Sequence, residues 1–135
     1  MQSKRTFIKA FLAFFATLGI YNPLSSKPMT HIDDGFVHVV YFWLKNPGSD
    51  NDKNAFFKSL KNYLGKVDVI RSKFIGTPAT SERDVVDDSF TYSVILTFKN
   101  KEDQDIYQEH PAHLKFIEES SSLWSKVVVY DSLPV

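Results

Sequence analysis

The nine-residue run from Phe36 to Leu44 constrains the fold more than any other stretch of this chain. β-Branched and aromatic residues dominate the run, and Asn46-Pro47-Gly48 follows closely, which is typical of a strand that ends in a turn. One face of this strand carries Phe36, His38, Val40, Phe42 and Leu44, and the other carries Val37, Val39, Tyr41 and Trp43. Both faces are largely apolar, so both must be covered in the folded protein.

The rest of the chain alternates between helix and strand patterns. Residues 50–64 place apolar side chains at helical spacing, between capping-type residues and Gly65, which predicts an amphipathic helix. Helices are also predicted at 101–109 and from Pro111 onward, and strands at 67–76 and 126–132. A further strand at 90–98 alternates cleanly, with Phe90, Tyr92, Val94, Leu96 and Phe98 on one face.

The predicted order is therefore β-α-β-β-α-α-β, which favours an α+β, ferredoxin-like domain with an antiparallel four-stranded sheet and its helices on one face. Helices on one face leave the other side of the first strand uncovered. A second copy packed sheet to sheet would cover it, so we expect a homodimer. The predicted dimer face consists of Val37, Val39, Tyr41 and Trp43, with Ile95 and Val128 as neighbours.

The first 30 residues read as an export signal or N-terminal anchor plus a short linker, which leaves residues 31–135 as the domain. A basic head with Lys4, Arg5 and Lys9 precedes an uncharged apolar run over residues 10–20, which is too short to span a membrane. No clear cleavage site follows, so membrane attachment through an uncleaved N-terminus stays open, as does an ordinary amphipathic helix. We expect an exported protein, in the periplasm or cell envelope if the host is bacterial.

Charge and cysteine content exclude several classes of function. Residues 28–135 contain 12 basic and 16 acidic side chains and no basic cluster, which argues against nucleic-acid binding. The absence of cysteine excludes disulfides, thiolate metal sites and cysteine nucleophiles. No phosphate-binding glycine loop or Ser-His-acid arrangement is present, and we predict no cofactor.

Two of the four histidines stand in one short segment, Tyr107-Gln-Glu-His110-Pro111-Ala-His113. Tyr107 and His113 could tie the helices to the sheet, or they could bind a ligand or perform catalysis. His110 is better placed for capping a helix. A metal site using His110 and His113 with nearby glutamates is disfavoured, because Pro111 interrupts the helical spacing that it would need.

Four features together resemble the stress-responsive dimeric A/B barrel family. They are the first strand with His38, Arg83-Asp-Val-Val-Asp87 before the third strand, the Tyr107-x-x-His-Pro-x-His113 segment, and the Val-Val-Val-Tyr-Asp131 ending. The match covers about residues 35–132. The resemblance implies the ferredoxin-like topology and the sheet-to-sheet dimer, a dimeric α/β barrel.

The chemistry that the resemblance implies is that of plant polyketide cyclases, in which a tyrosine and a histidine act together in an aldol condensation. These two residues match Tyr107 and His113, and a neutral imidazole beside a phenol suits proton abstraction next to a carbonyl. By the same resemblance, a pocket between sheet and helices would be lined by His38, Val40, Phe42, Phe56, Leu60, Val94, Phe116 and Trp124. Leu60 stands where the cyclases have a pocket tyrosine, and Tyr92 where they have a histidine.

Three hypotheses for function follow from the sequence. The first is an exported protein that binds a small apolar molecule, with a possible role in stress. The second is a cyclase-type lyase or isomerase in which His113 is the base and Tyr107 the hydrogen-bond donor. The third is a structural or interaction module of the cell envelope.

Overall fold

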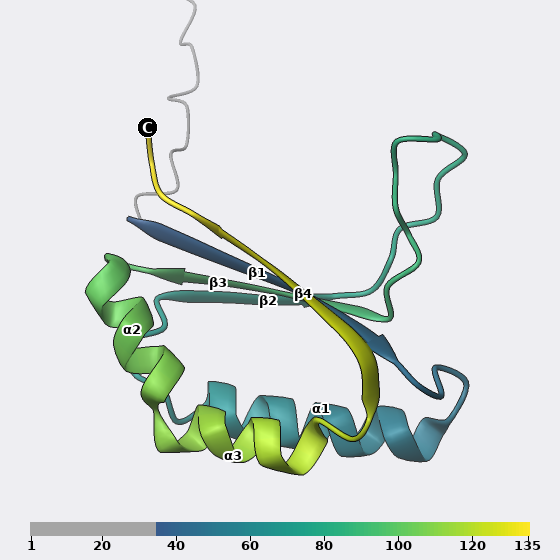
Figure 1. Cartoon of the computed structure of the whole chain (residues 1–135), viewed down its shortest axis with the longest axis horizontal. Coiled ribbons are helices and arrows are strands. Elements are labelled where there is room, and N and C mark those ends of the chain that lie inside the picture. The colour runs from purple at the N-terminus through teal and green to yellow at the C-terminus, as the bar shows by residue number, and fades with distance from the viewer. Residues whose placement is uncertain (1–34) are drawn as a thin grey trace, which may run out of the picture. The chain divides into compact units, whose positions relative to one another are not determined.

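The computed structural model describes residues 35–135, and the predicted export segment lies outside them. The elements follow the predicted order and are β1 (Phe36–Leu44), α1 (Asp50–Leu64), β2 (Ser72–Gly76), β3 (Tyr92–Phe98), α2 (Lys101–Glu109), α3 (Pro111–Ser120) and β4 (Trp124–Ser132). The strands form one antiparallel sheet in the order β2-β3-β1-β4. All three helices lie on the same face of this sheet (Figure 1). The predicted ferredoxin-like α+β fold is confirmed.

The burial of β1 follows its sequence pattern residue by residue. Side chains from Phe36 to Leu44 alternate between buried and half-buried, and the buried set faces the helices. β1 lies between β3 and β4 in the sheet, where its backbone groups pair on both sides. The prediction that both faces of this strand need cover is therefore met on one face by α1, α2 and α3, while the other face remains half-exposed.

The helix ends are fixed by local hydrogen bonds. The Ser49 hydroxyl accepts from the Asp52 backbone N–H at the start of α1, and the Asn100 side chain accepts from Asp103 in the same way at the start of α2. At the start of α3, the Ala112 backbone N–H donates to Nδ1 of His110. The sharp step from α2 to α3 at Pro111 places Tyr107 and His113 on neighbouring helices above the same part of the sheet.

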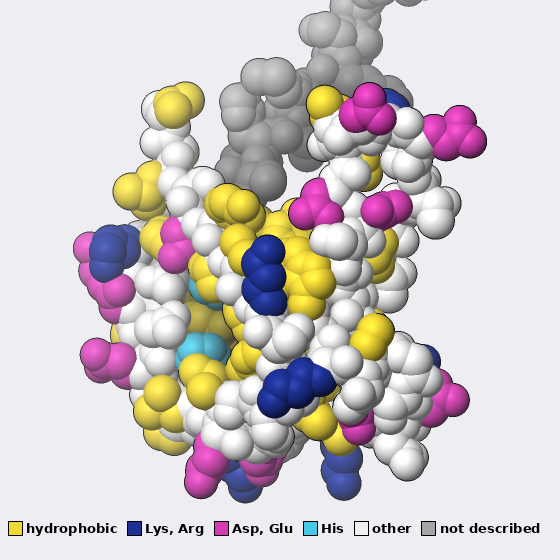
Figure 2. Space-filling model, turned by 45° about the vertical axis from the view of Figure 1, so that its right-hand side comes forward, with side chains coloured by type: hydrophobic (Ala, Val, Ile, Leu, Met, Phe, Trp, Pro, Cys, Tyr) yellow, Lys and Arg dark blue, Asp and Glu magenta, His cyan; other side chains and the backbone are white. Residues whose placement is uncertain are grey.

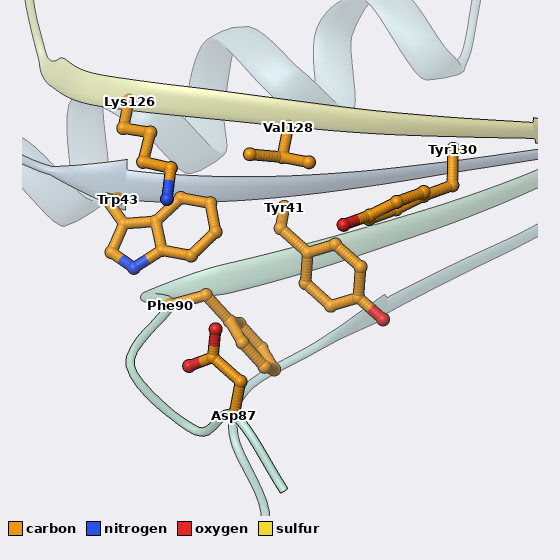
Figure 3. Close-up of a pocket in the computed structure, with 7 residues that line it drawn as sticks. All are labelled: Tyr41, Trp43, Asp87, Phe90, Lys126, Val128 and Tyr130. Carbon is orange, nitrogen blue, oxygen red and sulfur yellow. The ribbon is translucent and has the colours of Figure 1, made fainter. Parts of the chain in front are cut away.

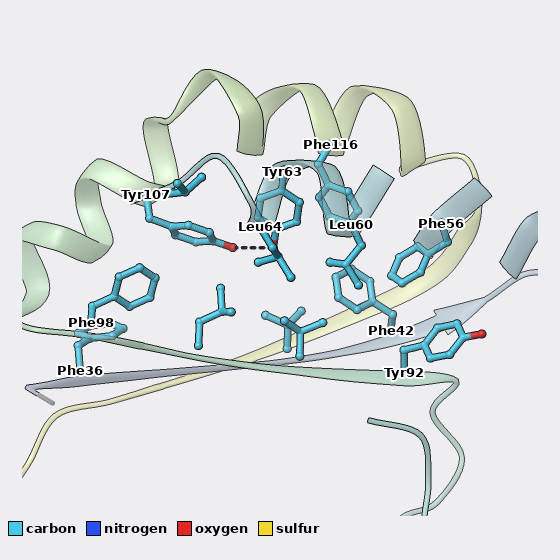
Figure 4. Close-up of a cluster of buried hydrophobic side chains, with 14 of the residues drawn as sticks. Phe36, Phe42, Phe56, Leu60, Tyr63, Leu64, Tyr92, Phe98, Tyr107 and Phe116 are labelled. Atoms are coloured by element: carbon cyan, nitrogen blue, oxygen red, sulfur yellow. Dashed lines mark hydrogen bonds between the residues drawn. The ribbon is translucent and has the colours of Figure 1, made fainter. Parts of the chain in front are cut away.

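The core lies between the sheet and the helices (Figure 4). Phe56 and Leu60 of α1 and Phe98 of β3 are completely buried in it. The rings of Phe56 and Tyr92 stack with centroids 5.4 Å apart. The Phe56 ring also contacts Phe116 of α3, so this aromatic packing holds α1 against the sheet and beside α3.

Two predictions about strand residues were wrong in detail. The second strand begins only at Ser72, because residues 67–70 form a turn in which Val67 is buried. Phe90 lies before the first paired residue of β3, so the alternation of the strand does not determine its side. Its ring instead packs against Tyr41 on the opposite face of the sheet, with centroids 4.8 Å apart. None of the helices within residues 35–135 combines the length and the apolar character needed to cross a membrane.

Candidate functional site

A cavity of about 290 Å³ lies between β1, β4 and the three helices. Its walls are mostly apolar, and its polar groups come from two histidines, two tyrosines and one glutamine. The lining residues are His38, Val40, Phe42, Tyr63, Tyr107, Gln108, His113, Phe116, Ile117, Trp124, Val127 and Val129. Histidine side chains are visible in a hollow bordered by hydrophobic side chains (Figure 2).

His113, in the first turn of α3, has a defined tautomer. Its Nδ1 lies 3.1 Å from the backbone carbonyl oxygen of Gln108. A carbonyl only accepts, so Nδ1 carries the proton, and Nε2 of the neutral ring keeps a free lone pair. Burial lowers the pKa of His113 below its usual value of about 6.5, and the neighbouring His38 and His110 lower it further. His113 is therefore a neutral base at pH 7.

Tyr107 is buried beside this imidazole, with its ring centroid 4.4 Å from that of His113. Its hydroxyl lies 3.3 Å from the hydroxyl of Tyr63 on α1, and Figure 4 shows this bond. Burial raises the pKa of Tyr107 to about 12, and burial also raises that of Tyr63. Both phenols stay protonated at neutral pH, so at this place in the cavity they act as hydrogen-bond donors.

A second imidazole, that of His38, is held by a carboxylate. The antiparallel register of β1 and β4 places His38 opposite Asp131, and Nδ1 lies 2.6 Å from the Asp131 Oδ1. The carboxylate oxygen accepts, so Nδ1 of His38 donates in this bond. The His38 ring meets Tyr107 in an edge contact at 5.4 Å. The polar groups thus gather at one end of the cavity.

The structure brings together most of the residues proposed for the site. Tyr107 and His113 line one cavity with five of the eight expected pocket residues, which are His38, Val40, Phe42, Phe116 and Trp124. Phe56, Leu60 and Val94 do not line it. They belong to the closed core, with at most 1% of each residue exposed, because they pack among the other side chains of the buried hydrophobic cluster.

Several lining residues were not foreseen from the sequence. Tyr63 falls seven residues after Phe56 on the same face of α1, so helical spacing could have pointed to it. Asp131 could have been paired with His38 only once the register of β1 against β4 was known. The remaining unforeseen lining residues are Gln108, Ile117, Val127 and Val129. Val127 and Val129 follow from the alternation of the last strand.

His110 takes part in helix capping. Its Nδ1 accepts from the Ala112 backbone N–H at 3.1 Å, and it is the N-cap of α3. This confirms the capping role expected for it. Among residues 35–135 no three histidines or carboxylates come together in a way that could hold a metal ion.

The face of the sheet opposite the helices has its own depression of about 320 Å³ (Figure 3). Its lining residues are Tyr41, Trp43, Asp87, Phe90, Lys126, Val128 and Tyr130. The ammonium group of Lys126 lies over the indole of Trp43, 4.3 Å from the ring centroid. Tyr130 and Phe74 are more than half exposed. This face is rich in aromatic surface.

Two plant proteins are similar in sequence. Olivetolic acid cyclase from Cannabis sativa is 26% identical over 97 residues, which cover 72% of this chain and 94% of the cyclase. A stress-response A/B barrel domain-containing protein from Arabidopsis thaliana is 28% identical over 97 residues, which cover 72% of this chain and 84% of that protein.

Solved structures agree on the fold. Hydroxynitrile lyase from Passiflora edulis superposes with a TM-score of 0.65 at 19% identity, covering 76% of this chain and 95% of the lyase. A dimeric ferredoxin-like protein from Thermobifida fusca gives a TM-score of 0.60 at 11% identity, covering 78% of this chain and 96% of its own. The family model for the stress-responsive A/B barrel domain matches residues 36–133, so this chain belongs to the stress-responsive A/B barrel domain family.

Proposed function

We propose that this protein binds a small, mostly apolar molecule in the cavity between the sheet and the helices. One observation carries the proposal: a 290 Å³ cavity in which Tyr107 and His113 stand side by side among apolar walls. Small-molecule sites typically combine apolar walls with a few converging polar groups, in cavities of roughly 300–1,000 Å³. The volume here is just below that range, which favours a compact ligand.

The two ends of the cavity differ in polarity, which determines the orientation of a bound molecule. His38 and Phe42 lie on the same face of β1, four residues or about 13 Å apart. His38 contacts Tyr107 at the polar end, whereas Phe42 contacts Phe116 and Trp124 at the other. A ligand that fits both ends carries a polar head and an aromatic or alkyl tail.

The test is the identification of whatever small molecule co-purifies with the full chain from its native host. Native mass spectrometry should detect a bound mass in the wild type. Ile117 lies at the edge of the cavity and is 38% exposed. Ile117→Trp replaces it by a bulky indole that should block the cavity, so the bound mass should disappear. Leu114→Trp, on the exposed side of the same helix, is the matched control and should retain it. An empty wild-type protein that also binds no apolar probe would contradict the proposal.

A second function, catalysis of the cyclase or lyase type, is favoured by the protonation states of the polar groups. Nε2 of His113 is free to accept a proton, and the phenol of Tyr107 is free to stabilise an oxygen. In the step that this arrangement suits, a proton leaves a carbon next to a carbonyl for Nε2, and the C–H electron pair moves onto the carbonyl oxygen. The similarity to olivetolic acid cyclase supports this function.

Proton exchange on a defined probe tests the catalytic function. The central carbon of 1-phenylbutane-1,3-dione exchanges hydrogen for deuterium through its enolate, and NMR measures the rate in D₂O. The full chain should accelerate the exchange, and His113→Ala should remove the acceleration while the fold is kept. Leu114→Ala, one residue away and half-exposed, should have no effect. Equal rates for wild type and His113→Ala would exclude His113 as the base.

The protein forms a homodimer through the outer face of the sheet. Val37, Val39, Tyr41 and Trp43 are only half-buried there, and they lie beside further aromatic side chains, which is typical of a surface that a partner covers. The Thermobifida fusca protein with the same fold is described as dimeric, which supports the proposal. A second copy on this face would cover the depression around Trp43.

Export is proposed from the first 30 residues alone. The basic head and apolar run are typical of a secretion signal, and the mature domain would then act in the periplasm or cell envelope of a bacterial host. Cell fractionation of the full chain, with a version lacking residues 1–30 as control, should find only the full chain exported. Cytoplasmic retention of both would contradict export. An exported protein with no ligand would instead fit the structural or interaction module.

A further inference from the structure

Tyr63 lines the cavity, but neither the proposed binding nor the proposed catalysis gives its hydroxyl a role. It reaches the cavity from α1, the helix opposite Tyr107 and His113, and only 3% of its side chain is exposed. Within residues 35–135, the only hydrogen-bond partner of either phenol hydroxyl is the other, at 3.3 Å. A buried hydroxyl normally has a hydrogen-bond partner for its donor.

Tyr63 and Tyr107 cannot provide acceptors for both of their O–H donors by bonding to each other. Two hydroxyls can share one hydrogen bond, in which one donates and the other accepts, so the accepting phenol keeps an O–H without an acceptor. At 3.3 Å this shared bond is also longer than the 2.7–2.8 Å usual for two hydroxyl oxygens. An oxygen atom that enters the cavity can therefore accept from both phenols in place of their weak mutual bond.

The rings that carry these hydroxyls are held firmly. The Tyr63 ring packs on Phe116 with centroids 4.6 Å apart, and Tyr107 is wedged between Phe98 at 5.1 Å and His113 at 4.4 Å. Three different helices supply Tyr63, Tyr107 and His113. The two donors and the base thus keep their mutual positions without a ligand, which is what stabilisation of a developing charge requires.

We infer that Tyr63 and Tyr107 together form a two-donor site for one oxygen of the ligand, and that this site selects compounds with a carbonyl or enol oxygen at the polar end. The inference rests on the proposed binding function and names the ligand class for it. Tyr63 binds the ligand oxygen directly. In the catalytic version, the oxygen held by the two phenols is the one that receives the C–H electron pair when His113 takes the proton.

Two probes of similar size separate oxygen recognition from apolar binding. The first is 1-phenylbutane-1,3-dione and the second is butylbenzene, which lacks oxygen, each titrated by calorimetry into the full-length protein. In the wild type the diketone should bind at least tenfold more tightly than the hydrocarbon. Tyr63→Phe should reduce this preference about five- to tenfold, the loss of one hydrogen bond, while butylbenzene affinity stays within twofold. Tyr92→Phe, a buried tyrosine outside this cavity, is the matched control and should change neither.

The titrations distinguish failure of the two-donor site from failure of the proposed ligand binding. Equal affinity of the wild type for the two probes, or an unchanged preference in Tyr63→Phe, overturns the two-donor site and leaves apolar binding intact. Binding of neither probe refutes both. Where exchange is catalysed, Tyr63→Phe should slow it tenfold or more with an unchanged pH profile, because His113 remains the titrating base. An unchanged exchange rate would also overturn the inference.

Discussion

The polar end of the cavity depends on hydrogen bonds that hold both imidazoles in place. The Gln108 carbonyl sets the tautomer of His113, and the Asp131 carboxylate accepts from Nδ1 of His38. Neither imidazole can rotate or exchange its proton without leaving a buried donor unpaired. Single substitutions should therefore act on this end of the cavity with measurable effects on stability as well as on binding.

Replacing Asp131 by alanine tests the His38 pair. Nδ1 of His38 would lose its acceptor in a position where only 5% of the residue is exposed, which should cost about 1–2 kcal/mol of unfolding free energy. Urea denaturation of the two proteins measures it. Asp105→Ala breaks an exposed pair with Lys101 and should stay within about 0.5 kcal/mol of the wild type. Equal losses of unfolding free energy in the two variants would show that the buried His38–Asp131 pair stabilises the fold no more than the exposed Lys101–Asp105 pair.

The lowered pKa of His113 gives stability a pH dependence of known sign. The unfolded chain binds a proton at this residue near the usual pKa of about 6.5, whereas the buried imidazole does so only at lower pH. Stability from this residue is complete above pH 6.5 and is lost as pH falls through the lower folded pKa. The wild type should lose more stability than His113→Gln between pH 7.5 and pH 5. Parallel curves would contradict a lowered pKa.

At the scale of elements, the junction between α2 and α3 determines where Tyr107 and His113 stand. His110 has extended backbone angles between the two helices and caps α3 with its own side chain. Pro111 then begins α3 without needing a backbone donor. This arrangement turns the chain sharply and brings two residues that are six apart in sequence into ring contact.

The capping role of His110 can be tested by a matched pair of substitutions. His110→Ala removes the acceptor for the Ala112 N–H and should lower stability by about 1 kcal/mol. His110→Asn keeps an acceptor of good capping geometry and should lose at most a few tenths of a kcal/mol. Thermal or urea unfolding distinguishes them. A smaller loss for alanine than for asparagine would refute the cap.

The helices and strands could be predicted from the sequence more completely than the residues that line the cavity. The alternation of Phe36–Leu44 identified β1, its two faces and its need for cover, because a strand obeys a strict two-residue period. The same reasoning failed for Phe90, which precedes the paired part of β3. Phe56 and Leu60 were expected in the pocket, but how the apolar face of α1 divides between closed core and cavity depends on how the other helices pack. Asp131 needed the strand register.

In the whole molecule, the two faces of the sheet have different surroundings. The helical face contains the cavity, whereas the outer face presents Tyr41, Trp43 and Tyr130 around a depression (Figure 3). Trp43 donates its indole N–H to the Ser89 hydroxyl, and Lys126 covers its ring. These two contacts hold the Trp43 ring in place on the proposed dimer face.

Trp43→Glu tests this face directly. A carboxylate on the proposed dimer face would have to leave water when a second copy packs there. An ion pair with the neighbouring Lys126 would not offset that desolvation, so the protein should become monomeric, as measured by light scattering. Leu114→Glu is the matched control, because it makes the same kind of change at a half-exposed residue on the helical face and should leave the dimer intact. A Trp43→Glu protein that is still dimeric would show that the interface lies elsewhere.

The proposed binding mode places a small molecule in the cavity under the three helices, with an oxygen at the polar end. NMR chemical-shift mapping of the labelled full chain during titration with 1-phenylbutane-1,3-dione tests it most directly. We expect the largest changes at His38, Tyr63, Tyr107 and His113, with further changes at Phe116 and Trp124 along the cavity. Changes confined to the outer face around Trp43, or no changes at all, would contradict this binding mode.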